Sequence, residues 1–312
     1  MTMNPAYDLT YRLDRFEYGA VQRVPVLTQR IGGKGINVSR VLKALGNSSV
    51  AMGFADHAFA VEAARELPVD FVTALPRVRR TVVLSEADGT TTGLWEPGAE
   101  LADPERAMAD LRRRIGELLP ATRGLVISGS LPGGVRPDFP AELARLAVAA
   151  GIPVICDVDG AALHAAVRVP GVVLMPNTDE LLALTGVAPG TSAEVVTVAK
   201  PLLDAGVAAI VATRGHAGMV AVTATCAWSA HSPEVISGNP TGAGDAAAAA
   251  VIAGLAAGIG WPALLADAVA TSAAAVARPV AGEIDHELRD RLIRQVRVEP
   301  VGGPNIQEQP CL

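Results

Sequence analysis

From about residue 120 onward, short apolar runs rich in Val and Ile alternate with longer segments of helical periodicity. This pattern predicts strands at residues 124–128, 152–157, 172–175 and 208–213, and helices at residues 139–150, 161–167 and 193–205. Strands that alternate with helices are typical of βαβ units, in which helices cover both faces of a parallel sheet. We therefore expect an α/β fold with a mainly parallel central sheet.

The first hundred residues follow a different pattern. Residues 9–30 and 69–94 contain alternating, β-rich stretches on either side of a helical segment at residues 37–45. Residues 87–90 are typical of a hairpin turn. We expect these stretches, extending to about residue 98, to form a small β lid set against the main sheet.

Composition narrows the class of protein. Half of the 312 residues are hydrophobic and only 4% are aromatic, so the core is expected to be aliphatic. The net charge of −6 argues against a nucleic-acid partner, because binding to a phosphate backbone needs a basic face. No apolar run approaches the roughly 18 residues of a membrane span, and the N-terminus has no signal-peptide pattern. We expect no membrane association and a cytoplasmic location.

The three cysteines, Cys156, Cys226 and Cys311, are far apart in the chain and form no CxxC pair. That spacing predicts neither a disulfide framework nor a structural zinc site, and it favours a reducing compartment.

The most informative motif is a glycine-rich turn at residues 238–244 that leads through Asp245 into an alanine-rich apolar helix. Glycines allow the backbone to approach a ligand, and the first turn of a helix offers free N–H groups and a positive dipole end to an anion. A carboxylate at this junction is placed to accept a proton during phosphoryl transfer. The alternative for Asp245 is a helix N-cap without a catalytic role.

Polar side chains follow the predicted parallel strands. They are Ser128, Ser130, Asp157, Asp159, Asn177, Glu180, Thr213 and Arg214. Ligands of open α/β sheets bind at the carboxyl ends of the strands. Taken singly, each of these residues could equally be a loop residue or a helix cap.

Two further motifs carry chemistry. The run at residues 32–39 places Lys34 to meet an anion and Asn37 to donate and accept hydrogen bonds, although it lacks the spacing of a Walker A loop. In the segment 176–181, Asn177 and Glu180 are three residues apart at the start of a predicted helix. Oxygen ligands in that arrangement suit a water-rich Mg²⁺.

In this order, and together with the opening run at residues 4–8, the motifs resemble the ribokinase-like sugar kinases of the phosphofructokinase-B branch. The resemblance runs from about residue 3 to residue 285, and it is strongest to 1-phosphofructokinases and tagatose-6-phosphate kinases. It implies a ribokinase-like three-layer α/β/α sandwich with a mainly parallel central sheet and a small β-sheet lid that often forms a homodimer. Residues 1–298 would form the kinase domain, and residues 299–312, rich in Pro, Gly and Gln, a loose tail.

The resemblance also implies roles for individual residues. Asp245 matches the general base, and the anion hole is matched by Gly242, Ala243 and Gly244. Asn177 and Glu180 match residues that organise Mg²⁺ and the nucleotide phosphates. The nucleotide-binding turn is matched by Thr213, Arg214, Gly215 and Gly218, and the sugar contacts by Asp8, Gly33, Lys34 and Asn37. Arg79 matches an arginine for the phosphate of the substrate, assisted by Lys34, and Ser130 is a further substrate-site candidate.

The expected activity is ATP-dependent phosphorylation of a ketohexose phosphate, with fructose 1-phosphate as the favoured substrate and ATP and Mg²⁺ as cofactors. Tagatose 6-phosphate, fructose 6-phosphate, an unphosphorylated sugar, and a non-catalytic sugar-binding role remain alternatives. Some positions depart from the family pattern. Thr81 and Trp95 replace common asparagines, and the strand before Asn4 is expected to be nearly absent.

Overall fold

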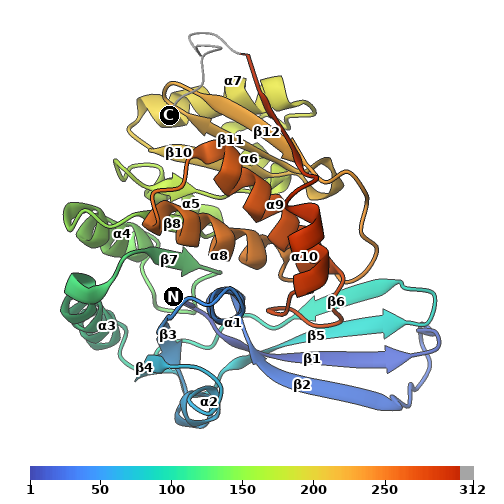
Figure 1. Cartoon of the computed structure of the whole chain (residues 1–312). Helices are drawn as coiled ribbons and strands as arrows, with labels where there is room; N and C mark the ends of the chain where they lie inside the picture. Colours follow the sequence, from blue (N-terminus) through green and yellow to red (C-terminus); the bar gives the residue numbers. More distant parts are fainter. Residues whose placement is uncertain (303–312) are drawn as a thin grey trace.

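The computed structural model describes residues 1–302 (Figure 1). Its main sheet has seven strands in the order β13-β12-β11-β10-β9-β8-β7. The four parallel strands are β7 (Leu125–Ser128), β8 (Val154–Asp157), β9 (Val173–Leu174) and β10 (Ala209–Thr213). They confirm the strands that the sequence predicts after residue 120. An antiparallel edge follows, made of β11 (Met219–Thr223), β12 (Ala227–His231) and β13 (Arg297–Pro300).

Helices cover both faces of this sheet. One layer contains α3 (Pro104–Leu118), α4 (Phe139–Ala149), α5 (Gly160–Ala166), α6 (Thr178–Thr185) and α7 (Ser192–Asp204). The other contains α1 (Lys34–Ala44), α8 (Ala243–Ala256), α9 (Trp261–Val276) and α10 (His286–Leu292). Successive side chains of a strand point to opposite faces. Accordingly, Ile155 packs with the second layer and Cys156 with the first. The predicted three-layer α/β/α sandwich is confirmed.

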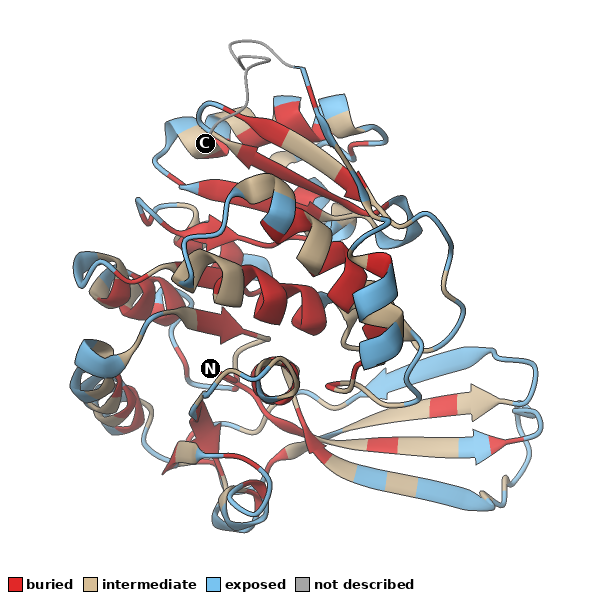
Figure 2. Cartoon of the chain, in the orientation of Figure 1, coloured by how far each residue is buried: buried red, intermediate tan, exposed pale blue. Residues whose placement is uncertain are grey.

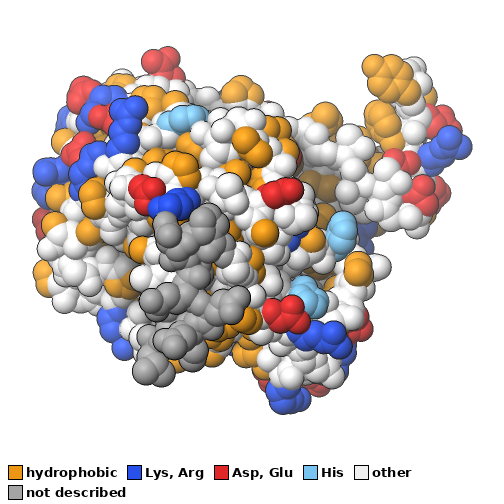
Figure 3. All heavy atoms as spheres, turned by 90° about the horizontal axis from the view of Figure 1, so that it is seen from above, with side chains coloured by type: hydrophobic (Ala, Val, Ile, Leu, Met, Phe, Trp, Pro, Cys, Tyr) orange, Lys and Arg blue, Asp and Glu red, His pale blue; other side chains and the backbone are white. Residues whose placement is uncertain are grey.

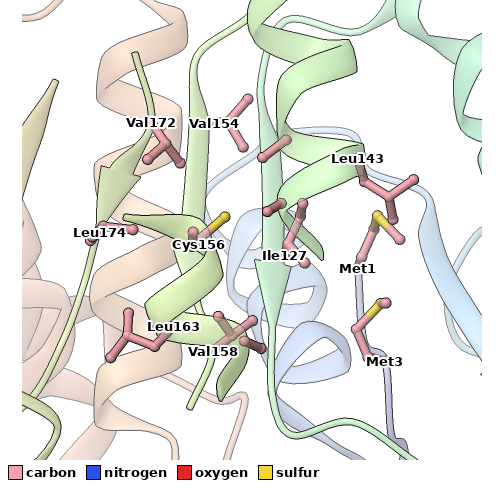
Figure 4. Packing of buried hydrophobic residues seen from close by; sticks show 14 of the residues in the cluster. Met1, Met3, Ile127, Leu143, Val154, Cys156, Val158, Leu163, Val172 and Leu174 are labelled. Carbon is pink, nitrogen blue, oxygen red and sulfur yellow. The ribbon is translucent and has the colours of Figure 1, made fainter. Parts of the chain in front are cut away.

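The first three residues join two parts of the molecule. Thr2 forms parallel bridges to Gly53, in β3 (Ala51–Ala55), and to Ser128, in β7. The side chains of Met1 and Met3 lie in the core beside Ile127 and Leu143 (Figure 4). A short strand-like segment is therefore present before Asn4, where the sequence pattern predicts almost none.

The lid is a separate four-stranded sheet in the order β2-β1-β5-β6. Its strands are β1 (Ala6–Leu13), β2 (Val26–Gly32), β5 (Arg79–Glu86) and β6 (Thr91–Trp95), and the predicted turn at residues 87–90 does join β5 to β6. The lid projects from the body at the lower right of Figure 1, and Figure 2 shows that its strands are mostly half-buried or exposed.

One predicted lid segment lies elsewhere. Strand β4 (Val69–Thr73) pairs in parallel with β3, and α2 (His57–Ala63) packs beside it. Phe71 and Val72 of β4 are buried in the main core. The alternating pattern of these residues correctly indicates a strand, but it does not identify the sheet to which the strand belongs.

The C-terminal part of the chain differs from expectation in two respects. Strand β13 extends to Pro300, so the predicted tail overlaps it by residues 299 and 300, and residues 303–312 lie outside the described part of the chain. Cys156 is a buried free thiol, whereas Cys226 is disulfide-bonded, although the spacing of the cysteines predicts no disulfide framework. Within residues 1–302, no helix has both the length and the hydropathy that crossing a membrane requires.

Candidate active site

Asp245 lies inside the first turn of α8 and is only 5% exposed. The N-cap of this helix is Gly242, with a φ of 84°, and no side chain caps it. A Cβ at Gly242 would lie 2.7 Å from the Cβ of Ala281, so both the backbone angle and the packing require glycine there. The alternative role of Asp245 as the N-cap of this helix is therefore wrong.

The backbone around Asp245 has unused hydrogen-bond donors. The N–H of Ala243 donates to the carbonyl oxygen of Pro240 at 3.2 Å. By helix geometry, the next two amides, of Gly244 and Asp245, have no acceptor within the helix. Together with the positive end of the helix dipole, they form a site for an anion next to the carboxylate.

A hydrogen bond from α1 orients the Asp245 carboxylate. Nδ2 of Asn37 donates to Oδ2 of Asp245 at 2.8 Å. Burial raises the pKa of Asp245 to about 6, against the opposing effects of Lys34 and of the Asn37 hydrogen bond. A carboxylate with this pKa is ionised at neutral pH and is a better proton acceptor than an exposed aspartate.

Lys34 lies among several carboxylates. Its Nζ lies 2.9 Å from Oδ1 of Asp157, at the carboxyl end of β8. Burial lowers the pKa of Lys34, but attraction to Asp157, Asp245 and Glu180 outweighs burial and the net shift is upward. Burial raises the pKa of Asp157 to about 7, helped by Asp245 and Glu180 and opposed by Lys34. The position of Asp157 at a strand end is evident from the sequence, whereas its pairing with Lys34 is not.

Asp8 and Arg79 lie on the lid strands that face this group. Oγ1 of Thr81 donates to Oδ1 of Asp8 at 2.5 Å, so the departure from the usual asparagine still provides a hydrogen bond. Arg79 donates through Nη1 to the carbonyl oxygen of Glu96 at 3.2 Å. Its buried Nε has no hydrogen-bond partner within the described residues. Burial lowers the pKa of Arg79, opposed by Asp8 and Asp159. This half-buried guanidinium retains donors for an anionic ligand.

Two further predicted substrate residues border the same region. Gly33 is the N-cap of α1 with a φ of 105°, and a Cβ there would lie 2.8 Å from Oγ1 of Thr2. Oγ of Ser130 accepts a hydrogen bond from Nδ2 of Asn4 at 3.1 Å. Asn4, which belongs to the opening motif but has no predicted role, is 4% exposed and leaves its Oδ1 without a partner within residues 1–302.

The predicted nucleotide residues lie next to one another at the ends of β9 and β10. Asn177 and Thr213 form a parallel bridge, and the turn at Gly215–Ala217 follows. Gly218 has a φ of 82°, and a Cβ there would overlap the carbonyl oxygen of Ala230. The guanidinium of Arg214 donates to Oγ of Ser192 at 3.1 Å and to the carbonyl oxygen of Gly190 at 2.7 Å, so it anchors the loop before α7.

Asn177 and Glu180 form a capping box at the start of α6. Each side chain accepts a hydrogen bond from the backbone N–H of the other residue at 2.9 Å. Within residues 1–302, no group of three or more His, Cys, Asp or Glu side chains could hold a metal alone. The excess of carboxylates around Lys34 nevertheless fits a cation held mainly by water and by substrate phosphates, which is how Mg²⁺ is commonly bound.

The chain matches known proteins over most of its length. The model of the pfkB family of carbohydrate kinases matches residues 1–287. A 1-phosphofructokinase from Xanthomonas campestris pv. campestris is 35% identical over an alignment of 270 residues, which covers 83% of this chain and 83% of that protein. Phosphofructokinase-2 from Escherichia coli in complex with potassium aligns with a TM-score of 0.86 and 27% identity, covering 94% of this chain and 97% of that chain. A possible 1-phosphofructokinase from Thermotoga maritima aligns with a TM-score of 0.86 and 26% identity, covering 96% of this chain and 98% of that chain.

The matched region contains the glycine-rich turn, Asp245 and the whole lid, so it includes both parts of the site. The ribokinase-like fold and the sugar-kinase class implied by the sequence motifs are thereby confirmed. This chain belongs to the pfkB family of carbohydrate kinases.

Proposed function

We propose that this sugar kinase transfers the γ-phosphoryl group of ATP to the C6 hydroxyl of fructose 1-phosphate, giving fructose 1,6-bisphosphate and ADP. The observation that carries the proposal is the buried Asp245 carboxylate, which is oriented by Asn37 beside the free amides of α8. The similarity to a 1-phosphofructokinase supports the choice of sugar.

In this mechanism the oxygen of the C6 hydroxyl attacks the γ-phosphorus, and Asp245 accepts the proton of that hydroxyl. The bond from that phosphorus to the β–γ bridging oxygen breaks, and ADP leaves with the electron pair. The amides of Gly244 and Asp245, with the dipole of α8, stabilise the negative charge on the transferred group. Because little covalent chemistry falls to the protein, positioning and charge stabilisation supply most of the rate enhancement.

Lys34 and Arg79 are proposed to bind the phosphates. Arg79 would hold the phosphate at C1 of the sugar, assisted by Lys34, with Asp8, Gly33, Asn37 and Ser130 around the sugar. The turn of Thr213, Arg214, Gly215 and Gly218 would hold the nucleotide next to Asn177. Asp157 would hold the Lys34 ammonium close to the reacting groups.

A panel of acceptors tests the substrate. We expect the highest kcat/KM with fructose 1-phosphate in an ADP-release assay, and lower values with tagatose 6-phosphate, fructose 6-phosphate and free fructose. Fructose 6-phosphate is the alternative with a specific observation behind it, because a structure of the related Escherichia coli phosphofructokinase-2 is in complex with that sugar. A preference for fructose 6-phosphate would contradict the proposed acceptor and leave the kinase class intact.

The proposal includes Mg²⁺, which would be held near Glu180 and Asn177 and would neutralise triphosphate charge. Activity should be lost in excess EDTA, and Glu180→Gln should lower kcat by at least about tenfold. The matched control is Glu194→Gln, because Glu194 forms the equivalent capping box with Thr191 at the start of α7. Glutamine also supports a capping box. Equal effects of the two substitutions would show that Glu180 acts only as a cap.

We also propose a homodimer formed through the lid. Its exposed apolar residues include Tyr18, Val21, Leu94 and Trp95, with exposed fractions of 98%, 94%, 57% and 71%. Figure 3 shows hydrophobic side chains on the lobe that projects at the right. In sedimentation velocity the wild-type protein should be a dimer and Leu94→Asp should be a monomer. Val61→Asp, on the exposed face of α2, should remain a dimer. A wild-type monomer at micromolar concentration would contradict this proposal.

A further inference from the structure

A pocket of about 600 Å³ lies between β2, the C-terminal half of α1, the connection from α2 to β4 and the loop that precedes α10. None of its lining residues belongs to the site described above. Four cationic side chains line it, Arg30, Arg40, Lys43 and Arg278, against two carboxylates, Glu66 and Glu283. The pocket therefore has an excess of two positive charges in a chain whose net charge is −6.

The carboxylates do not use all the donors of these cations. Glu283 lies 3.0 Å from Nη1 of Arg30 and 3.2 Å from Nη2 of Arg278, so it shares its charge between two guanidinium groups. The ammonium of Lys43 donates to the backbone carbonyl oxygen of Glu66 at 3.0 Å. Arg30, Lys43 and Arg278 thus retain N–H groups for another acceptor.

We propose that this pocket binds a small phosphorylated metabolite through its phosphate group. A phosphate dianion matches the excess of two positive charges. Guanidinium groups bind phosphate oxygens in a bidentate manner, and Lys43 adds a point charge. The volume lies within the range of small-molecule sites, about 300–1,000 Å³, and exceeds what an inorganic ion alone fills. The remainder of the ligand would occupy the space near Ala44 and Ile284.

The pocket is connected to the catalytic carboxylate through Arg40. Both oxygens of Glu66 accept hydrogen bonds from Arg40, at 2.5 and 2.8 Å, and Nη1 of Arg40 lies 3.5 Å from Oδ1 of Asn37. The other end of the Asn37 amide donates to Asp245. Gly282 packs against both residues, since a Cβ there would lie 2.8 Å from Cδ of Arg40 and 3.2 Å from Oδ1 of Asn37.

An anion that competes with Glu66 for Arg40, or shifts the loop at Gly282, alters the orientation of Asn37 and hence of Asp245. Ligand binding should therefore change kcat. This consequence rests on the proposed role of Asp245, whereas binding to the pocket does not.

Equilibrium dialysis with radiolabelled inorganic phosphate, without Mg²⁺, tests the binding site. The dialysis uses protein that already carries Arg79→Gln, because this substitution weakens the candidate sugar-phosphate site. In that background we expect about one phosphate per chain, and at least about tenfold weaker binding after Lys43→Gln and Arg278→Gln are added. Lys200→Gln, which removes an exposed ion pair on α7, is the charge-matched control. No binding in the Arg79→Gln background, or unchanged affinity after the pocket substitutions, overturns the proposal.

Kinetics of the protein with Arg79 intact test the connection. Lys43→Gln with Arg278→Gln should leave basal kcat unchanged, since both side chains are exposed and lie outside the catalytic groups. At saturating ATP and sugar phosphate, inorganic phosphate should change the kcat of the wild-type protein at least about twofold and should not affect the double variant. Purely competitive inhibition against the sugar phosphate, equal in both proteins, overturns the connection to Asp245.

Discussion

Asp245→Asn is expected to lower kcat by at least about 100-fold and to leave KM for ATP and sugar phosphate nearly unchanged. Asparagine has the same shape and can accept the hydrogen bond from Asn37, but it cannot take a proton at neutral pH. The measurement is an ADP-release assay at saturating concentrations of both substrates. If the variant keeps more than about a third of the wild-type kcat, the general base is another residue.

Two controls separate catalysis from folding. Asp103→Asn makes the same change in a residue that caps α3 by accepting the N–H of Arg106, and it should leave kcat unchanged. In the folded state the pKa of Asp245 is raised from 3.8 to about 6. Its protonation therefore favours the folded state at low pH, and this contribution is lost as pH rises through 6. At pH 8, Asp245→Asn should consequently unfold at the same temperature as the wild-type protein or at a higher one. At pH 4, the difference in unfolding temperature between the two proteins should be smaller.

The pH profile of the wild-type protein supplies an independent readout of the same assignment. Because Asp245 must be ionised to accept a proton, kcat/KM should fall as pH decreases below about 6. Asp157, whose pKa is raised to about 7, titrates in the same region. In Asp157→Asn only Asp245 of these two residues can titrate, so the fall in kcat/KM that remains in this variant belongs to Asp245. A rate that stays constant from pH 8 to pH 5 in that variant would contradict the role of Asp245.

Arg79→Gln is expected to raise KM for the sugar phosphate by about 10- to 100-fold and KM for ATP by far less. The half-buried guanidinium has an unused Nε donor and lies near Asp8 and Asp159, where a phosphate would complete its hydrogen bonds. The neighbouring Arg80 is exposed and belongs to the same strand, so Arg80→Gln is the matched control. Similar activity of the wild-type protein on free fructose and on its phosphates would exclude a phosphate-binding role for Arg79.

The parallel part of the main sheet could be predicted because its strands are buried on both faces. Such strands appear as short continuous apolar runs between helices, a pattern that does not depend on which strands pair. The assignment of β4 to the lid was wrong because pairing is a contact between distant segments. The pattern of residues 69–73 is the same whether the strand pairs with β3 in the core or with β5 in the lid.

The local parts of the site were also predictable. The turn before α8 needs glycine at Gly242 for its positive φ, and the start of a helix presents free backbone N–H groups whatever the remainder of the chain does. The order of the motifs along the chain was enough to identify the family, which the match over residues 1–287 confirms.

The sequence by itself thus determined the secondary structure of the parallel units, the glycine-dependent turns and the family. Only the tertiary structure decided how the motifs act on one another. Lys34 and Asp157 are 123 positions apart, and Asn37 and Asp245 are 208 apart, yet each pair forms a direct contact. The pKa of Asp245 depends on how completely the packed helices exclude water from its carboxylate, and the cationic pocket at Arg40 depends on four segments meeting. Burial and charge clustering are properties of the packed chain, and no local pattern of residues specifies them.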